Sequence, residues 1–367
     1  MSSLLKDLYS PAFYQRLSSV LAQTVPGFNA EQFTKQIFTS DFEAKELKER
    51  MKHTSAVLHT FLPANYAQSI GLLKKIIGIL RTQGSGSDGL AYMFLPDYIE
   101  TYGVDDFSNS IEALEFITQF VSCEFAVRPF ILKYSDRMIA VMEKWSVHES
   151  YQVRRLASEG SRPRLPWAMG IPALKKDPTP IMPILENLKN DSSEWVRRSV
   201  ANSLNDIAKD HPQIVLETAK RWSGLSKETD ALIKHGCRTL LKQGHTEILK
   251  HYGLSDEGIL FTDFELLTPE VKIGESLAFS FSISNSNLTE QKIRLEYAIY
   301  YKKLNGDRTK KVFKISERVY PARFKTTVNR KQKFVLITTR VFHPGTHQIA
   351  VIINGVEQAK TDFELLA

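Results

Sequence analysis

Three acidic residues stand on or beside apolar faces of predicted helices. Glu124 follows Val121 by three residues, so it continues a helical apolar stripe instead of the wet face. Asp206 borders the stripe that contains Leu204, and Glu159 precedes the glycine that ends another helical pattern. Carboxylates in such places are either neutralised by a partner or functional. These three residues are therefore the first candidates for a catalytic site.

The alternative to function is an ion pair within each helix. Arg128 lies four residues after Glu124, and Arg155 lies four residues before Glu159. This is the spacing at which side chains on one helix face meet. Spacing alone therefore favours a structural role for these carboxylates.

The segment SEGSRPRLPW, residues 158–167, combines charge, stiffness and an indole. Gly160 interrupts a helix, Arg162 and Arg164 alternate with two prolines, and Trp167 ends the segment. Two guanidinium groups and an indole on a turn stiffened by proline suit phosphate contact and stacking on a sugar or base. The alternative is a structural connector whose arginines pair locally.

Other chemical motifs are missing or weak. His53 and His59 are six residues apart with no third ligand nearby, and GSGSDG at 84–89 lacks the Lys-Ser/Thr of a phosphate-binding loop. We expect that glycine-rich stretch to be a flexible connector. The sequence contains no Walker, GxSxG or zinc-deaminase motif. It therefore predicts neither a metal nor a cofactor.

An internal repeat organises the second half of the helical region. Val153-Arg154-Arg155 recurs as Val196-Arg197-Arg198 after 43 residues, and Cys237-Arg238 follows 41 residues later. Each copy is flanked by helical patterns, and two-helix units of this length are typical of HEAT-like α-solenoids. Such units bury one face against their neighbours and present a concave groove, where the three carboxylates would lie.

The periodicity changes to that of β-strands after about residue 257. Leu277, Phe279, Phe281 and Ile283 alternate with small polar residues, and residues 293–301 follow the same pattern. Asn305-Gly306 and Asn354-Gly355 are typical hairpin turns. We therefore predict a mainly α protein with two domains: a HEAT-like solenoid over 1–257 and an all-β, immunoglobulin-like sandwich over 258–367.

Basic residues concentrate in the predicted sandwich. The chain has a net charge of +7, and residues 302–340 hold 13 basic and two acidic residues. This distribution predicts a nucleic-acid partner, although a basic surface that only confers solubility would look the same. The candidate contacts are Lys310, Lys311, Arg330 and Lys331.

Several features indicate a cytoplasmic protein. The two cysteines lie in helical patterns and suggest no disulfide framework, and no apolar stretch is long enough to span a membrane. The N-terminus lacks the pattern of a secretion signal. We expect a monomer with no obligate protein partner and no membrane partner.

Four stretches of the helical region together resemble the AlkC branch of the HEAT-like-repeat DNA alkylation repair glycosylases. VRRLASEGSRPRLPW is the most specific of them, and a C-terminal sandwich is similar to one carried by some members of that branch. The matching stretches are KELKERMKHTSAVLHTFLP (45–63), FVSCEFAVRPF (120–130), VRRLASEGSRPRLPW (153–167) and SSEWVRRSVANSLNDIAKDHP (192–212).

The resemblance implies a monofunctional DNA glycosylase whose partner is double-stranded DNA with alkylated bases. Such an enzyme hydrolyses the N-glycosidic bond of cationic bases such as 3-methyladenine and 3-methylcytosine, without extruding the lesion into a pocket. The family's catalytic positions match Glu124, Glu159, Asp206 and Trp167. The competing hypothesis is a non-catalytic DNA-binding scaffold, because solenoids commonly bind partners in their groove.

The chemistry of these residues agrees with the implied reaction. A cationic base is already a good leaving group, so the sugar, which becomes oxocarbenium-like, is the group that needs stabilisation. Carboxylates near the sugar would supply it, and Glu159 or Asp206 would orient water. Trp167 would add cation–π attraction. Arg155, Arg162, Arg164, Arg197 and Arg198 are the expected phosphate contacts of the solenoid.

Overall fold

The computed structural model describes residues 4–84, 89–336 and 341–367, and the chain divides into two compact units. The unit formed by residues 1–236 is helical, and the unit formed by residues 237–367 combines two short helices with two β-sheets. The predicted order, a helical body followed by an all-β part, is confirmed. Most of the glycine-rich connector expected at 84–89 lies outside the described residues.

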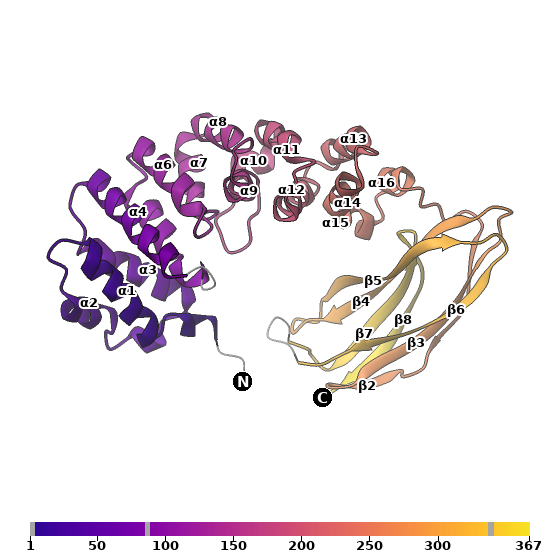
Figure 1. Ribbon diagram of the computed structural model, residues 1–367. Coiled ribbons are helices and arrows are strands. Elements are labelled where there is room, and N and C mark those ends of the chain that lie inside the picture. Colours follow the sequence, from indigo (N-terminus) through magenta and orange to yellow (C-terminus); the bar gives the residue numbers. More distant parts are fainter. Residues whose placement is uncertain (1–3, 85–88, 337–340) are drawn as a thin grey trace. The chain divides into compact units, whose positions relative to one another are not determined.

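Short α-helices, with 3-10 turns between some of them, build the first unit (Figure 1). Its 3-10 turns are η1 (Leu5–Leu8), η2 (Phe42–Ala44), η3 (Gly89–Tyr92) and η4 (Thr179–Ile181). Its first helices are α1 (Pro11–Thr24), α2 (Ala30–Ile37), α3 (Leu47–His59), α4 (Tyr66–Thr82), α5 (Phe94–Tyr102), α6 (Phe107–Thr118) and α7 (Val127–Tyr134). The others are α8 (Asp136–Trp145), α9 (Tyr151–Gly160), α10 (Pro172–Lys176), α11 (Met182–Leu188), α12 (Glu194–Ile207), α13 (Pro212–Trp222) and α14 (Lys227–Gly236).

Local sequence explains where several of these helices begin. The side chain of a short polar residue accepts a hydrogen bond from the backbone N–H three residues later, which satisfies a donor that the first helical turn leaves unpaired. Proline occupies the first turn of α1 and α13, where no N–H is needed. The capping residues are Ser10, Asn29, Asn65 and Asp106.

Helices α9, α12 and α14 pack side by side, and α8, α11 and α13 cover them in a second row (Figure 1). The first arginine of the motif makes equivalent hydrogen bonds in two copies of the repeat. Nη1 of Arg154 donates to the carbonyls of residues 148 and 149 at 2.9 and 2.8 Å. Nη1 of Arg197 donates to the equivalent carbonyls of residues 191 and 192 at 2.6 and 3.0 Å. The internal repeat is therefore structural as well as sequential.

The third copy of the repeat does not lie where the sequence pattern placed it. Helix α14 takes the third place in the row, and Thr229, fully buried near its start, matches Val153 and Val196. Cys237 follows the end of α14, so the expected equivalence of Cys237-Arg238 is wrong. The pattern failed because a hydroxyl residue fills the buried position, where the two earlier copies have valine.

Two sheets form the second unit together with the helices α15 (Arg238–Gln243) and α16 (Thr246–His251). One sheet has the order β1-β3-β6, and the other has the order β2-β8-β7-β4-β5. The strands are β1 (Ile259–Leu266), β2 (Glu270–Lys272), β3 (Ser276–Asn285), β4 (Gln291–Lys302), β5 (Arg308–Tyr320), β6 (Lys325–Lys333), β7 (Gly345–Ile353) and β8 (Val356–Leu366).

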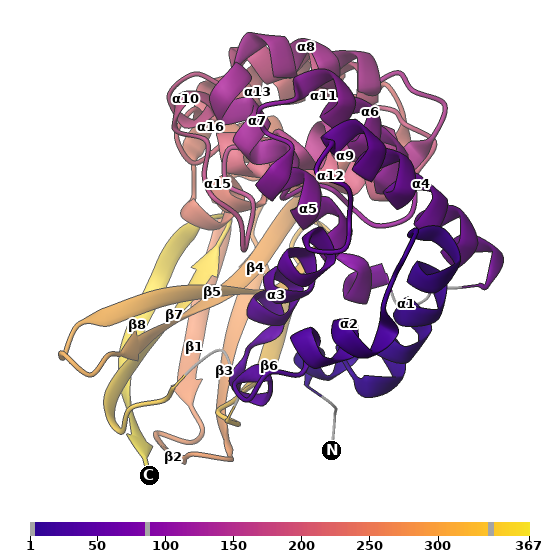
Figure 2. The same ribbon diagram turned by 90° about the vertical axis from the view of Figure 1, so that its left-hand side faces the viewer.

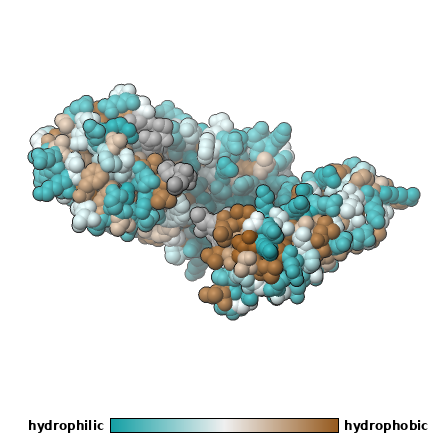
Figure 3. All heavy atoms as spheres, turned by 90° about the horizontal axis from the view of Figure 1, so that it is seen from below, coloured by the Kyte–Doolittle hydropathy of each residue, from teal (hydrophilic) through white to brown (hydrophobic). Residues whose placement is uncertain are grey.

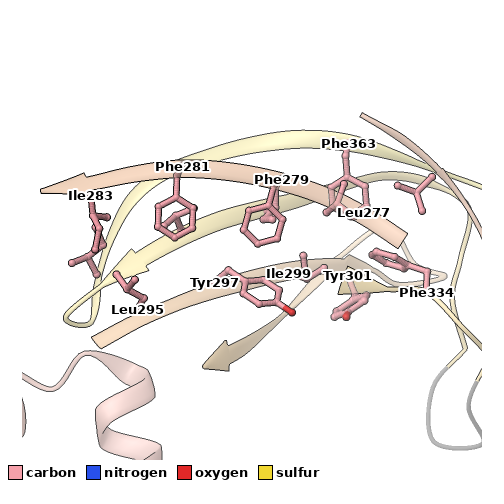
Figure 4. Close-up of a cluster of buried hydrophobic side chains, with 14 of the residues drawn as sticks. Leu277, Phe279, Phe281, Ile283, Leu295, Tyr297, Ile299, Tyr301, Phe334 and Phe363 are labelled. Carbon is pink, nitrogen blue, oxygen red and sulfur yellow. The ribbon is translucent and has the colours of Figure 1, made fainter. Parts of the chain in front are cut away.

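Alternating apolar residues of β3 and β4 face each other across the sandwich, as the sequence predicted (Figure 4). The rings of Phe279 and Tyr297 meet edge to face at 5.2 Å between centroids. Each such side chain contributes about 1.5–3 kcal/mol through burial. The predicted Asn354-Gly355 turn joins β7 to β8, and both of its residues adopt the positive φ that a tight hairpin needs.

The two short helices of the second unit contact its strands. A Cβ on Gly244, at the end of α15, would meet the Gly355 carbonyl oxygen at 2.5 Å. Lys292 on β4 donates to the carbonyl of Tyr252, just after α16, at 3.3 Å. The predicted domain boundary at 257/258 falls between α16 and β1, but α15 and α16 group with the strands. The boundary itself stays a prediction.

The surface of the second unit carries apolar as well as basic side chains. Apolar atoms gather on one part of it in Figure 3. Val335, Leu336 and Val341, which flank residues 337–340 in the sequence, are all exposed. Within the described part of the chain, no helix has the length and apolarity needed to cross a bilayer.

Candidate active site

Two carboxylates from neighbouring repeats meet on a single guanidinium. Glu159 lies at the end of α9, and Asp206 lies at the end of α12. Arg162, in the loop after α9, donates from Nη1 to Glu159 Oε1 at 2.5 Å and from Nε to Asp206 Oδ2 at 2.9 Å. All three side chains are at most 8% exposed. The fold thus gathers two buried negative charges around one positive charge.

This arrangement keeps Arg162 charged. Burial alone would lower the pKa of Arg162, but attraction by Glu159 and the hydrogen bond to Asp206 outweigh it and raise that pKa above its usual value. Removing one partner from such a buried group leaves uncompensated charge. The three side chains therefore form one electrostatic unit.

The two carboxylates differ in how fully they are bonded. Asp206 uses both oxygens, because Lys209 Nζ also donates to its Oδ1 at 3.2 Å. Glu159 uses Oε1, and among the described residues no hydrogen bond reaches its Oε2, which is not fully buried. Glu159 therefore retains one carboxylate oxygen that no hydrogen bond among the described residues occupies.

Glu124 lies in the segment between α6 and α7, and it pairs separately. Its Oε2 accepts hydrogen bonds from Ser122 Oγ at 2.6 Å and from Arg155 Nη1 at 2.7 Å. Arg155 precedes Glu159 by one helical turn on α9, so Glu124 approaches the same face of that helix. The structure therefore brings Glu159 and Asp206 together and links Glu124 to them through Arg155.

The ion pairs expected from helical spacing do not form. Residues 121–126 are not helical, so Arg128 does not project beside Glu124 and instead donates to backbone carbonyls. Arg155 turns to Glu124, and Glu159 pairs with Arg162 of the following loop. The expectation failed because tertiary contacts, and not the i, i+4 spacing, selected the partners.

Trp167 lies on the loop between α9 and α10, and its side chain is 64% exposed. Its φ of +66° falls in the left-handed region, which residues with a side chain seldom adopt. Arg164 anchors the same loop to the end of α12, because its Nη2 donates to Asp210 Oδ1 at 2.9 Å. An exposed indole thus stands on a tethered loop that also carries Arg162, the partner of Glu159 and Asp206.

The solenoid arginines predicted to bind phosphate differ in their availability. Arg162 is buried in its double ion pair, so its position favours holding the carboxylates over contacting phosphate. Arg155 and Arg164 are partly exposed but paired, and Arg197 holds loop carbonyls. Arg198 is exposed, and it lines a pocket of about 380 Å³ that Lys227 also borders.

Sequence reasoning missed a second pocket of about 290 Å³ beside Arg155. Tyr151 from α9 and Trp195 from α12 line it, and Trp195 is 62% exposed. Gln119 and Gln152 add amide groups. Such an aromatic and polar surface suits a nucleobase or sugar. An exposed tryptophan directly after a repeat's first helical residue was the available signal in the sequence.

Sequence reasoning also missed two carboxylates on α5, next to α3 (Figure 2). Asp97 and Glu100 border a small pocket that Ser122 and Phe125 also line. Burial, followed by the negative charge of Asp97, raises the pKa of Glu100 to about 7. Lys52 and Lys48 of α3 oppose that shift. Glu100 therefore titrates near neutral pH beside the segment that carries Glu124.

The basic residues predicted in the sandwich lie on edge strands. Strand β5 ends one sheet and β6 ends the other. Lys310 pairs with Glu357 at 2.6 Å, and Arg330 donates to the carbonyl of Ile315 at 3.5 Å. Lys331 is exposed, as is Lys311, whose ammonium lies 5.2 Å from the Phe313 ring centre. Lysines on edge strands also prevent edge-to-edge pairing, so their position fits either role.

The described residues contain no group of three or more histidine, cysteine or acidic side chains arranged to hold a metal ion. His53 Nε2 lies 2.9 Å from the Ile37 carbonyl oxygen, and His59 stacks on Tyr102 at 3.7 Å. Both histidines thus have structural contacts.

Comparisons with known proteins identify relatives over the whole chain. Residues 261–367 match the family model described as the C-terminal Ig-like domain of the uncharacterised protein YhaZ. The uncharacterised protein YhaZ of Bacillus subtilis (strain 168) is 42% identical over 362 residues, which are 98% of this chain and 99% of that protein.

A solved structure resembles the chain equally completely. It is the alkylpurine DNA glycosylase AlkC of Pseudomonas fluorescens, bound to DNA that contains an abasic-site analogue. The two share 36% sequence identity with a TM-score of 0.92, and the match covers 100% of each chain.

Proposed function

This chain belongs to the family that includes YhaZ and AlkC, and from that membership and its carboxylate centre we propose that it is a DNA glycosylase for alkylated bases. The observation that carries the proposal is the sharing of Arg162 by Glu159 and Asp206. A protein that only grips phosphates has no use for two buried carboxylates in this place.

The proposed reaction is hydrolysis of the N-glycosidic bond of cationic bases, with 3-methyladenine and 3-methylcytosine as substrates. The departing base needs no protonation, and positive charge develops on the sugar as the bond breaks. Fixed carboxylates stabilise that charge more than they stabilise the ground state. At an effective dielectric of about 20, one unit pair at 4 Å contributes roughly 4 kcal/mol. Two such groups account for several orders of magnitude in rate.

We assign different roles to the three carboxylates. Glu159 orients the attacking water, because its Oε2 is the oxygen left without a hydrogen bond among the described residues. Asp206, bonded through both oxygens, serves as fixed negative charge. Glu124 pairs with Arg155 and joins the site from the side of α7. Trp167, exposed on its loop, packs against the nucleotide without the base being extruded into a pocket.

Double-stranded DNA is the proposed partner of both units. Arg198 and the pockets beside Arg155 and Lys227 offer contacts on the solenoid. Lys311, Arg330 and Lys331 offer them on the sandwich. We propose that the enzyme acts as a cytoplasmic monomer that removes the base and leaves an abasic site.

Base release from methylated duplex DNA tests the function. The purified full-length protein should liberate free 3-methyladenine and leave sites that alkali cleaves. Undamaged duplex is the matched control. Binding that ignores the lesion, with no free base after prolonged incubation, would instead establish a non-catalytic DNA-binding scaffold.

A further inference from the structure

The backbone at Trp167 is held in a conformation that it would not adopt alone. The left-handed φ of +66° is unfavourable for a residue other than glycine, because the Cβ approaches the following carbonyl oxygen. The side chain is 64% exposed, so packing of the indole does not enforce this backbone. Strain of this kind persists only where surrounding contacts over-determine it. Those contacts therefore have to come from the backbone of the loop.

Arg128 supplies contacts of that kind from beneath the loop. Its side chain on α7 is fully buried, and it spreads over three backbone carbonyls of the segment 160–169. Nη1 donates to Gly160 at 3.0 Å and to Arg162 at 2.9 Å, and Nε donates to Met169 at 2.5 Å. One guanidinium thus holds three points of this segment. They are Gly160 at the end of α9, Arg162, which binds both carboxylates, and Met169, two residues after Trp167.

A structural ion pair would not look like this. Among the described residues no carboxylate forms a salt bridge with Arg128, and its Nη2 has no hydrogen-bond partner. Burial and the positive charge of Arg162 lower its pKa to about 10. Asp206 and Glu159 attract Arg128 through space, but its hydrogen bonds all go to backbone carbonyls of one segment. The hydrogen bonds of Arg128 therefore fix the backbone of the loop that carries Trp167.

Lys48 supplies the contact from the other side. Its ammonium, at the start of α3, donates to the carbonyl of Trp167 itself and lies 5.2 Å from the ring centre of Phe125. Phe125 directly follows Glu124, so one lysine touches both the Trp167 loop and the segment that carries Glu124. Residues 119 positions apart are joined by this bond.

We propose that Lys48 and Arg128 are positioning residues that hold Trp167 in its left-handed conformation and thereby preorganise the aromatic wall of the site. The inference rests on the proposed function for its kinetic consequence, but the loop geometry can be tested without any activity. Neither residue touches the reacting atoms. Both act through the carbonyls that flank or belong to Trp167.

The sharpest variant is Lys48→Met, which keeps a long apolar stem over Phe125 and removes the ammonium. We expect kcat for base release to fall about tenfold, which corresponds to about 1.4 kcal/mol, while KM and the affinity for abasic-site DNA stay unchanged. Lys48→Arg should restore most of the rate, because its guanidinium can still donate to the carbonyl. Lys35→Met, exposed on α2, is the matched control and should behave as wild type.

Hydrogen exchange supplies the readout that does not depend on activity. In Lys48→Met and in Arg128→Lys, the amides of residues 164, 165 and 167–171 should exchange faster than in wild type, and those of α12 should not. If these amides exchange faster in the variants but the wild-type protein releases no base, the glycosylase proposal is rejected and the positioning role is kept. Unchanged exchange and unchanged kcat in Lys48→Met, in a folded protein, would overturn the positioning role.

Discussion

Arg162 determines the charge of the site at the scale of single residues. Its guanidinium donates hydrogen bonds to both Glu159 and Asp206, so one cation joins two carboxylates in a buried place. The sequence identified the two acids as candidates because Asp206 borders an apolar helix stripe and Glu159 precedes the glycine that ends a helical pattern. It could not identify their common partner, because the Arg162–Asp206 contact joins residues 44 positions apart. Neither helical spacing nor local motifs encode such a contact.

Replacing Arg162 with methionine should destabilise the protein in a pH-dependent way. Two buried carboxylates would then repel each other, and the free energy of unfolding near pH 7 should fall by about 3 kcal/mol. Protonation of either carboxylate removes this repulsion, so the loss of stability should be smaller at low pH than at neutral pH. Urea unfolding at pH 5 and pH 7.5 measures this difference. Adding Glu159→Gln to the Arg162 variant should restore part of the lost free energy of unfolding. An equal loss at pH 5 and pH 7.5 would contradict a repulsion between the two carboxylates.

At the scale of elements, helix α5 brings a titrating carboxylate to the edge of the site. The pKa of Glu100 is raised from 4.5 to about 7, so its contribution to stability is fully present below pH 4.5 and is lost as pH rises through 7. Each pKa unit corresponds to about 1.4 kcal/mol. Glu100→Gln should therefore not lose stability in this way. Its free energy of unfolding should exceed that of wild type by up to about 3 kcal/mol at pH 8 and differ little at pH 4.5.

Denaturant unfolding of wild type and Glu100→Gln across that pH range checks the prediction. Glu112→Gln, an exposed carboxylate on α6, is the control and should follow wild type. If the free energies of unfolding of wild type and Glu100→Gln changed with pH in the same way, Glu100 would behave like an ordinary surface carboxylate.

The repeat units show what sequence can predict at this scale. The shared Val-Arg-Arg motif located α9 and α12, because each valine is buried and each first arginine closes the loop before its helix. The third unit escaped because Thr229 replaces the valine. The pockets beside Arg155 and Arg198 were not predicted either, because each is formed between helices of different repeats in the first unit.

At the scale of the whole molecule, the β-sandwich was predictable from its period of two and its Asn-Gly turns. The role of its basic edge strands was not, because lysine on an edge strand serves both DNA binding and protection from aggregation. Its α15 and α16 helices were not assigned to it either, because their helical pattern continues that of the solenoid while their contacts are with strands.

Neutralising the edge strands distinguishes the two roles. Arg330→Gln together with Lys331→Gln should weaken binding to duplex DNA and reduce the slope of log K against log salt by about 0.9 for each lost phosphate contact. Lys272→Gln with Lys360→Gln, outside the β5 and β6 edges, is the matched control. An unchanged slope with increased aggregation would assign these residues to edge protection.

The central claim is that Glu159 and Asp206 stabilise positive charge on the sugar, and single-turnover release of 3-methyladenine from methylated duplex tests it most directly. Glu159→Gln and Asp206→Asn should each slow release at least about tenfold and leave the affinity for abasic-site DNA unchanged, and Glu217→Gln, exposed on α13, should match wild type. Unchanged rates, or rates that fall only in proportion to affinity, would contradict the claim.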